Sequence, residues 1–304
     1  MPRKTYWDLT ERPHTERKLE ILDDYIHPWA KIIFSQWLKK RHKNFKIAYY
    51  VDCFAGRGKY HKDGQQNTIS GSPLIALNCA EHIKKKYGGE VELKCIFCEI
   101  KPKYLKELET FCKPYKGIVD YKIYPGDINI IINSILSKIG KNASLFFIDP
   151  CGVKDLKKKT VTQILNKRGP NDLLLNYICG APRVLGKVES MLKRGEKSDQ
   201  LFKLFNSVKS RYGLNLIFEC FGQKDKEILV KWATEILKDT QLKYRSVYRM
   251  LRPHNNEVAY YLLFASRSPA AKKIVDYIFN KKDSEGYYGQ ARLPFGNKAD
   301  YDLK

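Results

Sequence analysis

The sequence predicts an α/β protein in which a mostly parallel sheet is covered by helices on both faces. Apolar runs of strand length fall at 47–53, 91–98, 119–124, 144–148 and 172–178. Segments with helical periodicity lie between them, near 72–87, 102–112, 129–139 and 160–166. Such alternation is typical of parallel sheets, whose strands need helical crossovers. The first run also ends in a glycine-rich turn at 52–58, as strands that lead into nucleotide-binding loops do.

The two ends of the chain complete this prediction. A first helix is expected to open at Pro13, because apolar residues recur at helical spacing from Leu19 to Trp37. Late in the chain, 244–251 and 258–265 are two further apolar runs of strand length, and a final helix is expected at 269–279. This order resembles the core of AdoMet-dependent methyltransferases, whose sheet ends in an antiparallel hairpin that the two late runs fit. The resemblance implies a Rossmann-like, mostly parallel seven-stranded sheet with a helical insertion.

The segment 180–241 is too long for a simple crossover and has a helical pattern. We therefore expect an α/β core at 1–179 and 242–281, a basic helical insertion at 180–241, and a C-terminal arm at 282–304. The stretch 154–211 carries 14 basic and 5 acidic residues. An insertion at the carboxyl edge of the sheet, where ligands bind, would serve as a lid that grips a substrate. The alternative is a helical addition with a solvated face.

Charge is the unusual bulk property. The 304 residues include 56 Lys and Arg against 33 Asp and Glu, a net charge of +23. This excess favours a nucleic acid, RNA or DNA, as partner, although a merely solvated lysine surface is the alternative. No apolar run reaches the roughly 20 residues of a membrane span, and the N-terminus lacks a secretory signal. The cysteines lie mostly in apolar segments, which favours reduced thiols and a cytoplasmic location.

The turn after the first strand is the strongest candidate for a cofactor loop. Asp52-Cys53-Phe54-Ala55-Gly56-Arg57-Gly58 follows an apolar strand, and glycines allow close approach to a ligand. The loop resembles that of many nucleic-acid methyltransferases. The resemblance implies that the loop binds S-adenosyl-L-methionine (AdoMet) and that Asp52 orients its methionine end. A nicotinamide site is disfavoured, because the third glycine of the dinucleotide fingerprint is missing.

Acids also end the next two strands. Glu99 closes the second, where a carboxylate can accept both ribose hydroxyls of the cofactor. Asp127 follows the third, where relatives contact the adenine amino group. Each alone has a bland alternative as a helix cap or a solvated turn residue. Together with Asp52 they predict an AdoMet site at one edge of the sheet.

Asp149-Pro150-Cys151-Gly152 ends the fourth strand, where the methyl group would face its acceptor. Base-amine methyltransferases carry Asp/Asn-Pro-Pro-aromatic here, and tRNA guanine dimethyltransferases carry Asp-Pro-Phe-Gly. An exocyclic amine is a poor nucleophile, so a carboxylate and a backbone carbonyl that accept its N–H bonds would align it. Asp149 is thus the catalytic candidate. The alternative is a buried helix cap.

Cysteine offers two other chemistries. Cytosine C5 methyltransferases use a Pro-Cys thiolate at this position, but their Glu-Asn-Val companion is absent, so Cys151 is not expected to be a nucleophile. Cys95 and Cys98 form a C-x-x-C pair. Because residues three apart on a strand face opposite sides, this pair is not expected to bind a metal.

Across most of its length the chain resembles the three-Cys-motif partner (TcmP) family. The blocks that carry the resemblance are Pro13-His14-Thr15 with Lys18, the Asp52-x-Phe-Ala-Gly loop, Gly71-Ser72-Pro73-Leu74, Phe147-Ile148-Asp149-Pro150-x-Gly152 and the strand near Tyr260. The resemblance implies a partner that looks like a radical-AdoMet iron–sulfur protein. His14 and Lys18 lie one helical turn apart, so both are candidate substrate contacts; the alternative is that they are an ordinary exposed pair. The other candidate substrate contacts are Pro150, Cys151 and Gly152.

The leading hypothesis is an AdoMet-dependent methyltransferase that acts on an exocyclic base amine of RNA or DNA. The first rival is an adaptor that binds AdoMet and nucleic acid while another protein does the chemistry, but an adaptor has no need of Asp149. A protein or small-molecule methyltransferase is disfavoured by the charge. A nuclease is disfavoured because no compact cluster of metal-binding carboxylates is evident.

Overall fold

A seven-stranded sheet forms the centre of the computed structural model, which describes residues 13–39, 45–61, 68–152, 155–178, 181–251 and 258–284. The strand order is β5-β4-β1-β6-β7-β9-β8, and β9 runs in the direction opposite to the other six strands. The strands are β1 (Ile47–Asp52), β4 (Glu92–Glu99), β5 (Tyr121–Pro125), β6 (Ala143–Ile148), β7 (Asn171–Ile178), β8 (Tyr244–Leu251) and β9 (Val258–Ser266). This topology is that of the Rossmann-like methyltransferase fold, as the sequence predicts.

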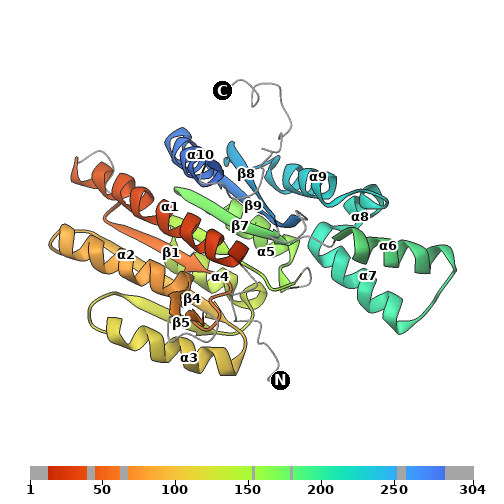
Figure 1. The fold of residues 1–304 in the computed structure, drawn as a ribbon, viewed down its shortest axis with the longest axis horizontal. Coiled ribbons are helices and arrows are strands. Elements are labelled where there is room, and N and C mark those ends of the chain that lie inside the picture. Colours follow the sequence, from red (N-terminus) through yellow and green to blue (C-terminus); the bar gives the residue numbers. More distant parts are fainter. Residues whose placement is uncertain are drawn as a thin grey trace.

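Helices cover both faces of the sheet (Figure 1). One face is packed by α1 (Pro13–Leu38), α2 (Ser72–Lys86), α3 (Pro102–Cys112) and α10 (Pro269–Ser284). The other face is packed by α4 (Ile128–Ile139), α5 (Lys158–Leu165) and the helices between β7 and β8. A short 3-10 turn (Lys113–Tyr115) follows α3. The carboxyl ends of the parallel strands therefore open onto one edge, where the loops can form a site.

The period of two along a strand distributes the core between the two faces. Tyr50 belongs to the apolar cluster under α1 and α2, whereas Val51 belongs to the cluster under α4 and α5. The same alternation separates the C-x-x-C pair, since Cys95 lies in the first cluster and Cys98 in the second. The two thiols therefore lie on opposite faces of the sheet, as their spacing on a strand predicts.

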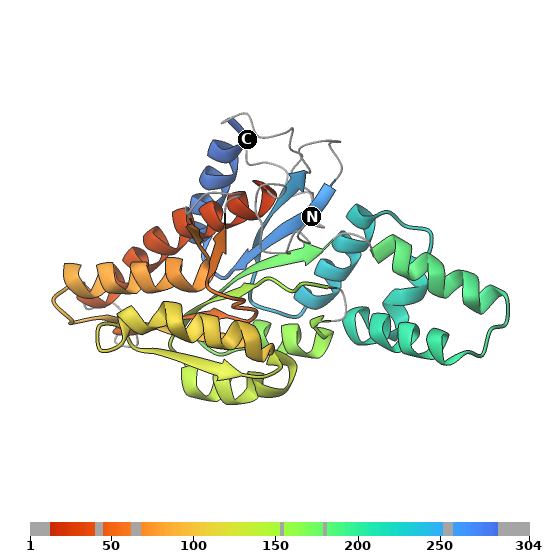
Figure 2. The same ribbon diagram turned by 60° about the horizontal axis from the view of Figure 1, so that its bottom comes forward.

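The region 180–241 contains α6 (Ala181–Lys193), α7 (Asp199–Tyr212), α8 (Leu214–Cys220) and α9 (Asp225–Leu237). Figure 2 shows α6 and α7 projecting from the side of the molecule, while α9 lies against the sheet. Val208 and Trp232 share one apolar cluster with Ile164 of α5, so this region has no core of its own. The predicted arm from 282 begins with the last turn of α10, and 285–304 lie outside the described residues.

A two-stranded hairpin, β2 (Lys59–His61) and β3 (Thr68–Ser70), joins β1 to α2 and was not predicted. Strands of three residues are too short to show a period in the sequence. The hairpin brings Gly71 back to the glycine-rich loop after β1, where its N–H donates to the carbonyl of Gly58 at 2.8 Å.

Within the described part of the chain, we find no helix that combines the length and apolarity needed to cross a bilayer.

Candidate active site

The loop after β1 is held from behind by Asp52. This carboxylate is fully buried; it accepts the N–H of Phe54 at 3.1 Å and the hydroxyl of Tyr50 at 3.4 Å, and it also hydrogen-bonds Ser72. Burial raises the pKa of Asp52 to about 7, although the bonds from Ser72 and Phe54 lower it in part. The structure therefore places Asp52 inside the loop, where it fixes the loop's shape.

The block Gly71-Ser72 completes this support. A Cβ at Gly71 would lie 2.8 Å from the carbonyl oxygen of Gly58, which is closer than a Cβ carbon approaches another non-bonded atom. Gly58 itself has a φ of 86°, a conformation that favours glycine. Two sequence blocks that are separate in the chain thus form one unit, with Ser72 bonded to Asp52 and Gly71 bonded to Gly58.

Glu99 connects the first loop to the second. Its carboxylate, 7% exposed, accepts the N–H of Gly56 at 2.9 Å and that of Lys101 at 2.7 Å, one on each oxygen. A carboxylate has about four acceptor positions, so Glu99 keeps capacity for ligand hydroxyls. The cysteines beside it, Cys53 and Cys98, are buried, and burial raises the pKa of both thiols, so both are neutral at physiological pH.

Asp127 caps helix α4. Its Oδ1 accepts the backbone N–H of Asn129 at 2.8 Å and the side-chain amide of Asn129 at 2.7 Å. Asn129 in turn holds the segment before α5, since it donates to the carbonyl of Asp155 at 2.9 Å and accepts the N–H of Lys157 at 2.9 Å. Asp127 is therefore a helix cap, which was the structural alternative to a role in binding. The cap uses Oδ1, so Oδ2 of Asp127 can still accept a hydrogen bond from a ligand.

Asp149, at the end of β6, is held by two side chains from distant elements. The ammonium group of Lys18, on α1, pairs with Oδ2, and the amide of Asn176, on β7, donates to Oδ1 at 2.6 Å. Lys18 is 4% exposed, so this is a largely buried ion pair. The neighbouring cation fixes the orientation of the Asp149 carboxylate.

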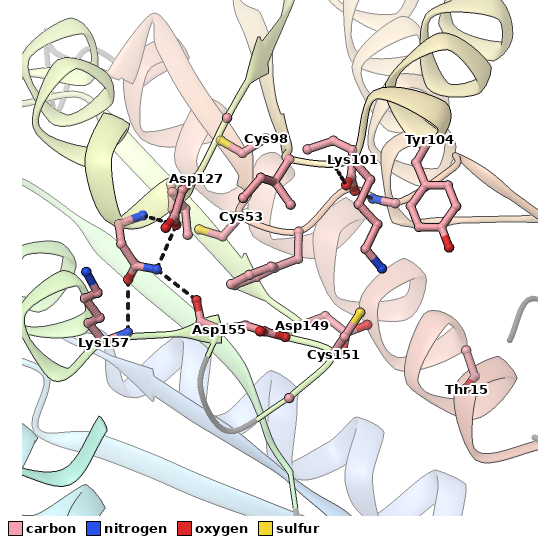
Figure 3. Close-up of a pocket in the computed structure, with 18 of the residues that line it drawn as sticks. Thr15, Cys53, Cys98, Lys101, Tyr104, Asp127, Asp149, Cys151, Asp155 and Lys157 are labelled. Atoms are coloured by element: carbon pink, nitrogen blue, oxygen red, sulfur yellow. Dashed lines mark hydrogen bonds between the residues drawn. The ribbon is translucent and has the colours of Figure 1, made fainter. Parts of the chain in front are cut away.

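These residues surround one cavity of about 550 Å³ at the carboxyl ends of β1, β4 and β6. Its wall carries the carboxylates of Glu99, Asp127, Asp149 and Asp155 and the ammonium groups of Lys18, Lys101 and Lys157. Glu99 lies at the end of β4, Asp127 follows β5, and Asp155 lies between β6 and α5. Figure 3 shows Asp127 and Lys157 on one side of this cavity and Lys101 with Tyr104 on the other.

The predicted site residues divide into two groups. The residues that line the cavity are Phe54, Gly56, Glu99, Asp127, Lys18, Asp149, Cys151 and Gly152. Among the described residues, those that do not line it are Asp52, Ala55, Gly58 and Pro150. The side chain of His14 lies outside the described residues. Cys151 is exposed at the cavity wall.

Several lining residues were not predicted: Thr15, Tyr60, Lys101, Tyr104, Asn129, Asp155 and Lys157. Asn176 was also missed, although a polar residue in the apolar strand β7 was a usable signal. Tyr60 lies on the short strand β2, and the others lie in loops and first helical turns, whose direction the sequence does not reveal. Within the described part of the chain, no group of at least three His, Cys, Asp or Glu side chains is placed to hold a metal ion.

Comparison with known proteins adds likenesses of structure alone. No family model matches the chain, and none of the curated proteins matches it. A Legionella pneumophila protein of family DUF519 is 12% identical and aligns with a TM-score of 0.49 over 97% of this chain and 99% of its own. A spermidine synthase from Thermotoga maritima is 11% identical, with a TM-score of 0.39 over 96% of this chain and 71% of its own. The DszA carbon methyltransferase is 11% identical, with a TM-score of 0.40 over 78% of this chain and 53% of its own.

Proposed function

We propose that this protein is an AdoMet-dependent methyltransferase that acts on an exocyclic amine of a nucleic-acid base. One observation carries the proposal. A single cavity joins the acids of the predicted cofactor side, Glu99 and Asp127, to the acid of the predicted acceptor side, Asp149. Cofactor and acceptor must meet in one space for a group to pass between them.

The cavity fits AdoMet by size and by charge. A volume of about 550 Å³ lies within the usual range for small-molecule sites. Glu99 has acceptor capacity for ribose hydroxyls, and Oδ2 of Asp127 is available for an amino group. Gly56, with a φ of 64°, adds a stretch of wall without a side chain. When bound, AdoMet supplies an electrophilic methyl group on a sulfonium centre.

Asp149 would hold the acceptor. Lys18 and Asn176 fix its carboxylate, and each oxygen keeps a further lone pair for an N–H of the substrate. Hydrogen bonds from an amine to a fixed carboxylate would turn the nitrogen lone pair toward the methyl group and limit its delocalisation. Lys18 acts through Asp149 in this scheme and is a positioning residue.

A second candidate function is supported by the same ion pair. Both oxygens of Asp149 already have partners in the protein, so the pair with Lys18 is also what a purely structural carboxylate would show. The protein would then be an AdoMet-binding, nucleic-acid-binding subunit without its own transfer activity. Membership of the three-Cys-motif partner family, and a radical-AdoMet-like partner, belong to this proposal and rest on the sequence resemblance alone.

The test begins with binding and continues to transfer. Calorimetric titration with AdoMet should give saturable heat, and Glu99→Gln should weaken binding about tenfold or more, because a glutamine cannot accept both backbone N–H groups. Glu109→Gln, an exposed change on α3, is the matched control. Labelled AdoMet is then incubated with total RNA, DNA and protein separately. Label in nucleic acid would support the methyltransferase, and AdoMet binding without any label would support the subunit without transfer activity. If AdoMet does not bind, both proposals are wrong.

A further inference from the structure

Arg211 is a buried cation at the end of α7 with no ion pair to a carboxylate within the described part of the chain. Its side chain is 2% exposed. The guanidinium carbon lies 4.4 Å from the ring centre of Trp232 and 5.8 Å from that of Tyr177. The indole of Trp232 also donates to the carbonyl of Arg211 at 3.1 Å. Tyr212 also hydrogen-bonds the Arg211 side chain, and Asp155 attracts it electrostatically without a direct ion pair. These contacts compensate only part of the desolvation of a buried charge.

One hydrogen bond leaves this aromatic cage. Nη1 of Arg211 donates to the carbonyl oxygen of Leu156 at 3.3 Å. The residues on both sides of Leu156, which are Asp155 and Lys157, line the cavity. Arg211 itself does not line it, so its effect on the cavity must pass through the backbone of 155–157.

Asn129 holds the same three residues from the opposite side. Its amide donates to the carbonyl of Asp155 at 2.9 Å, and its oxygen accepts the N–H of Lys157 at 2.9 Å. The oxygen also accepts the hydroxyl of Thr160 at 2.7 Å. Two consecutive peptide units of this wall are therefore fixed. Helix α4 holds the carbonyl of the unit 155–156 and the N–H of the unit 156–157, and α7 of the insertion holds the carbonyl of the unit 156–157.

We propose that Arg211 is a positioning residue, which makes the insertion a support for the cavity wall at 155–157. The type of residue at this position supports the role. An apolar side chain would fill the space beside Trp232 without the desolvation penalty of a buried charge, and such replacements are often neutral or stabilising. An arginine is useful there because a long donor can reach the carbonyl of Leu156. The ligand-binding part of this inference rests on the proposed function.

The consequence is a coupling between two regions. Nucleic acid that displaces α7 would also shift the wall beside Asp127, and a ligand that orders the wall would favour one position of α7. The network Asp127–Asn129–wall–Arg211 is continuous in hydrogen bonds, with one covalent step along the chain.

The experiment uses Arg211→Met in the full chain, with Leu201→Ala as the matched control. Leu201 is a buried residue at the other end of α7 and does not line the cavity. Amide hydrogen exchange at Lys157, whose N–H is bonded to Asn129, reports on the wall without any ligand. We expect Arg211→Met to speed this exchange about tenfold or more at a nearly unchanged melting temperature. Leu201→Ala should lower the melting temperature by several degrees, and exchange at Lys157 should stay near its wild-type rate.

A second measurement adds the ligand. AdoMet should bind Arg211→Met about five- to tenfold more weakly than it binds the wild-type protein, and Arg211→Lys should restore part of the affinity. Unchanged exchange at Lys157 in Arg211→Met would overturn the proposal and leave Arg211 as a core residue. If the wild-type protein fails to bind AdoMet, the proposed function fails, but the exchange result still decides the role of Arg211.

Discussion

The ammonium group of Lys18 pairs with the carboxylate of Asp149, 131 residues later in the chain. The pair joins the first helix to the end of β6 and is closed on its other side by Asn176 of β7. Helix α1 therefore contributes two residues to the cavity wall, Lys18 and, one turn earlier, Thr15. Separation along the chain hides this relationship from any local pattern in the sequence.

Asp149→Asn should lower methyl transfer about 100-fold or more and leave the AdoMet dissociation constant within about threefold of the wild-type value. The asparagine keeps the shape and one acceptor oxygen but loses the charge that Lys18 fixes. Single-turnover transfer and calorimetric titration provide the two readouts. A folded variant with normal turnover would show that Asp149 is only structural.

Lys18→Met should destabilise the protein by about 3 kcal/mol, because it leaves the partly buried carboxylate of Asp149 without its cation. Urea unfolding measures this difference. Lys85→Met is the control, since Lys85 pairs with Glu81 on the exposed face of α2 and such pairs contribute little. Equal stability loss in the two variants would mean that the Lys18 pair is no stronger than a surface pair.

Gly71→Ala should destabilise the protein by about 1 to 3 kcal/mol and weaken AdoMet binding. The added methyl would press on the carbonyl of Gly58 and displace the loop that Asp52 supports. Gly186→Ala, in α6, meets nothing within 4 Å and should stabilise its helix slightly. Thermal unfolding and calorimetry test both variants. Wild-type stability and affinity in Gly71→Ala would contradict the close contact.

Stability should fall as pH rises through the range in which Asp52 titrates. The pKa of Asp52 is raised from 3.8 to about 7 in the folded state, so the folded protein binds more protons between these values. This contribution is complete below about pH 4 and is lost as pH rises through about 7. Asp52→Asn should therefore gain stability relative to wild type as pH rises from 5 to 8, measured by urea unfolding at each pH. A pH-independent difference would show that the pKa is not raised.

Binding to nucleic acid should depend steeply on salt, because a net charge of +23 implies the neutralisation of several phosphates. Affinity for single-stranded RNA or DNA should fall on the order of 1000-fold between about 50 and 200 mM salt if about six or more phosphates are contacted. Fluorescence anisotropy with a labelled oligonucleotide gives the slope. A flat response would favour a surface of solvated lysines.

Local patterns in the sequence determined the fold. Apolar runs of strand length, helical spacing between them and the glycine turn after the first strand predicted the seven main strands and the helices of the core within a few residues. Such patterns involve residues that are near one another in the chain, so they can be recognised in a single sequence. The same logic indicated that acids at strand ends meet at one edge, and Glu99, Asp127 and Asp149 do line one cavity.

Only the tertiary structure decided which way each side chain points and which distant residues meet. Asp52 ends a strand as Glu99 does, yet the turn after β1 rotates its carboxylate inward, where Phe54 and Ser72 bind it. The supports of the site, Asn176 and Arg211, come from elements that follow β6, and their contacts depend on strand order and helix packing. Those are collective properties of the folded chain, because a hydrogen bond across a site is set by three-dimensional position and not by spacing along the sequence.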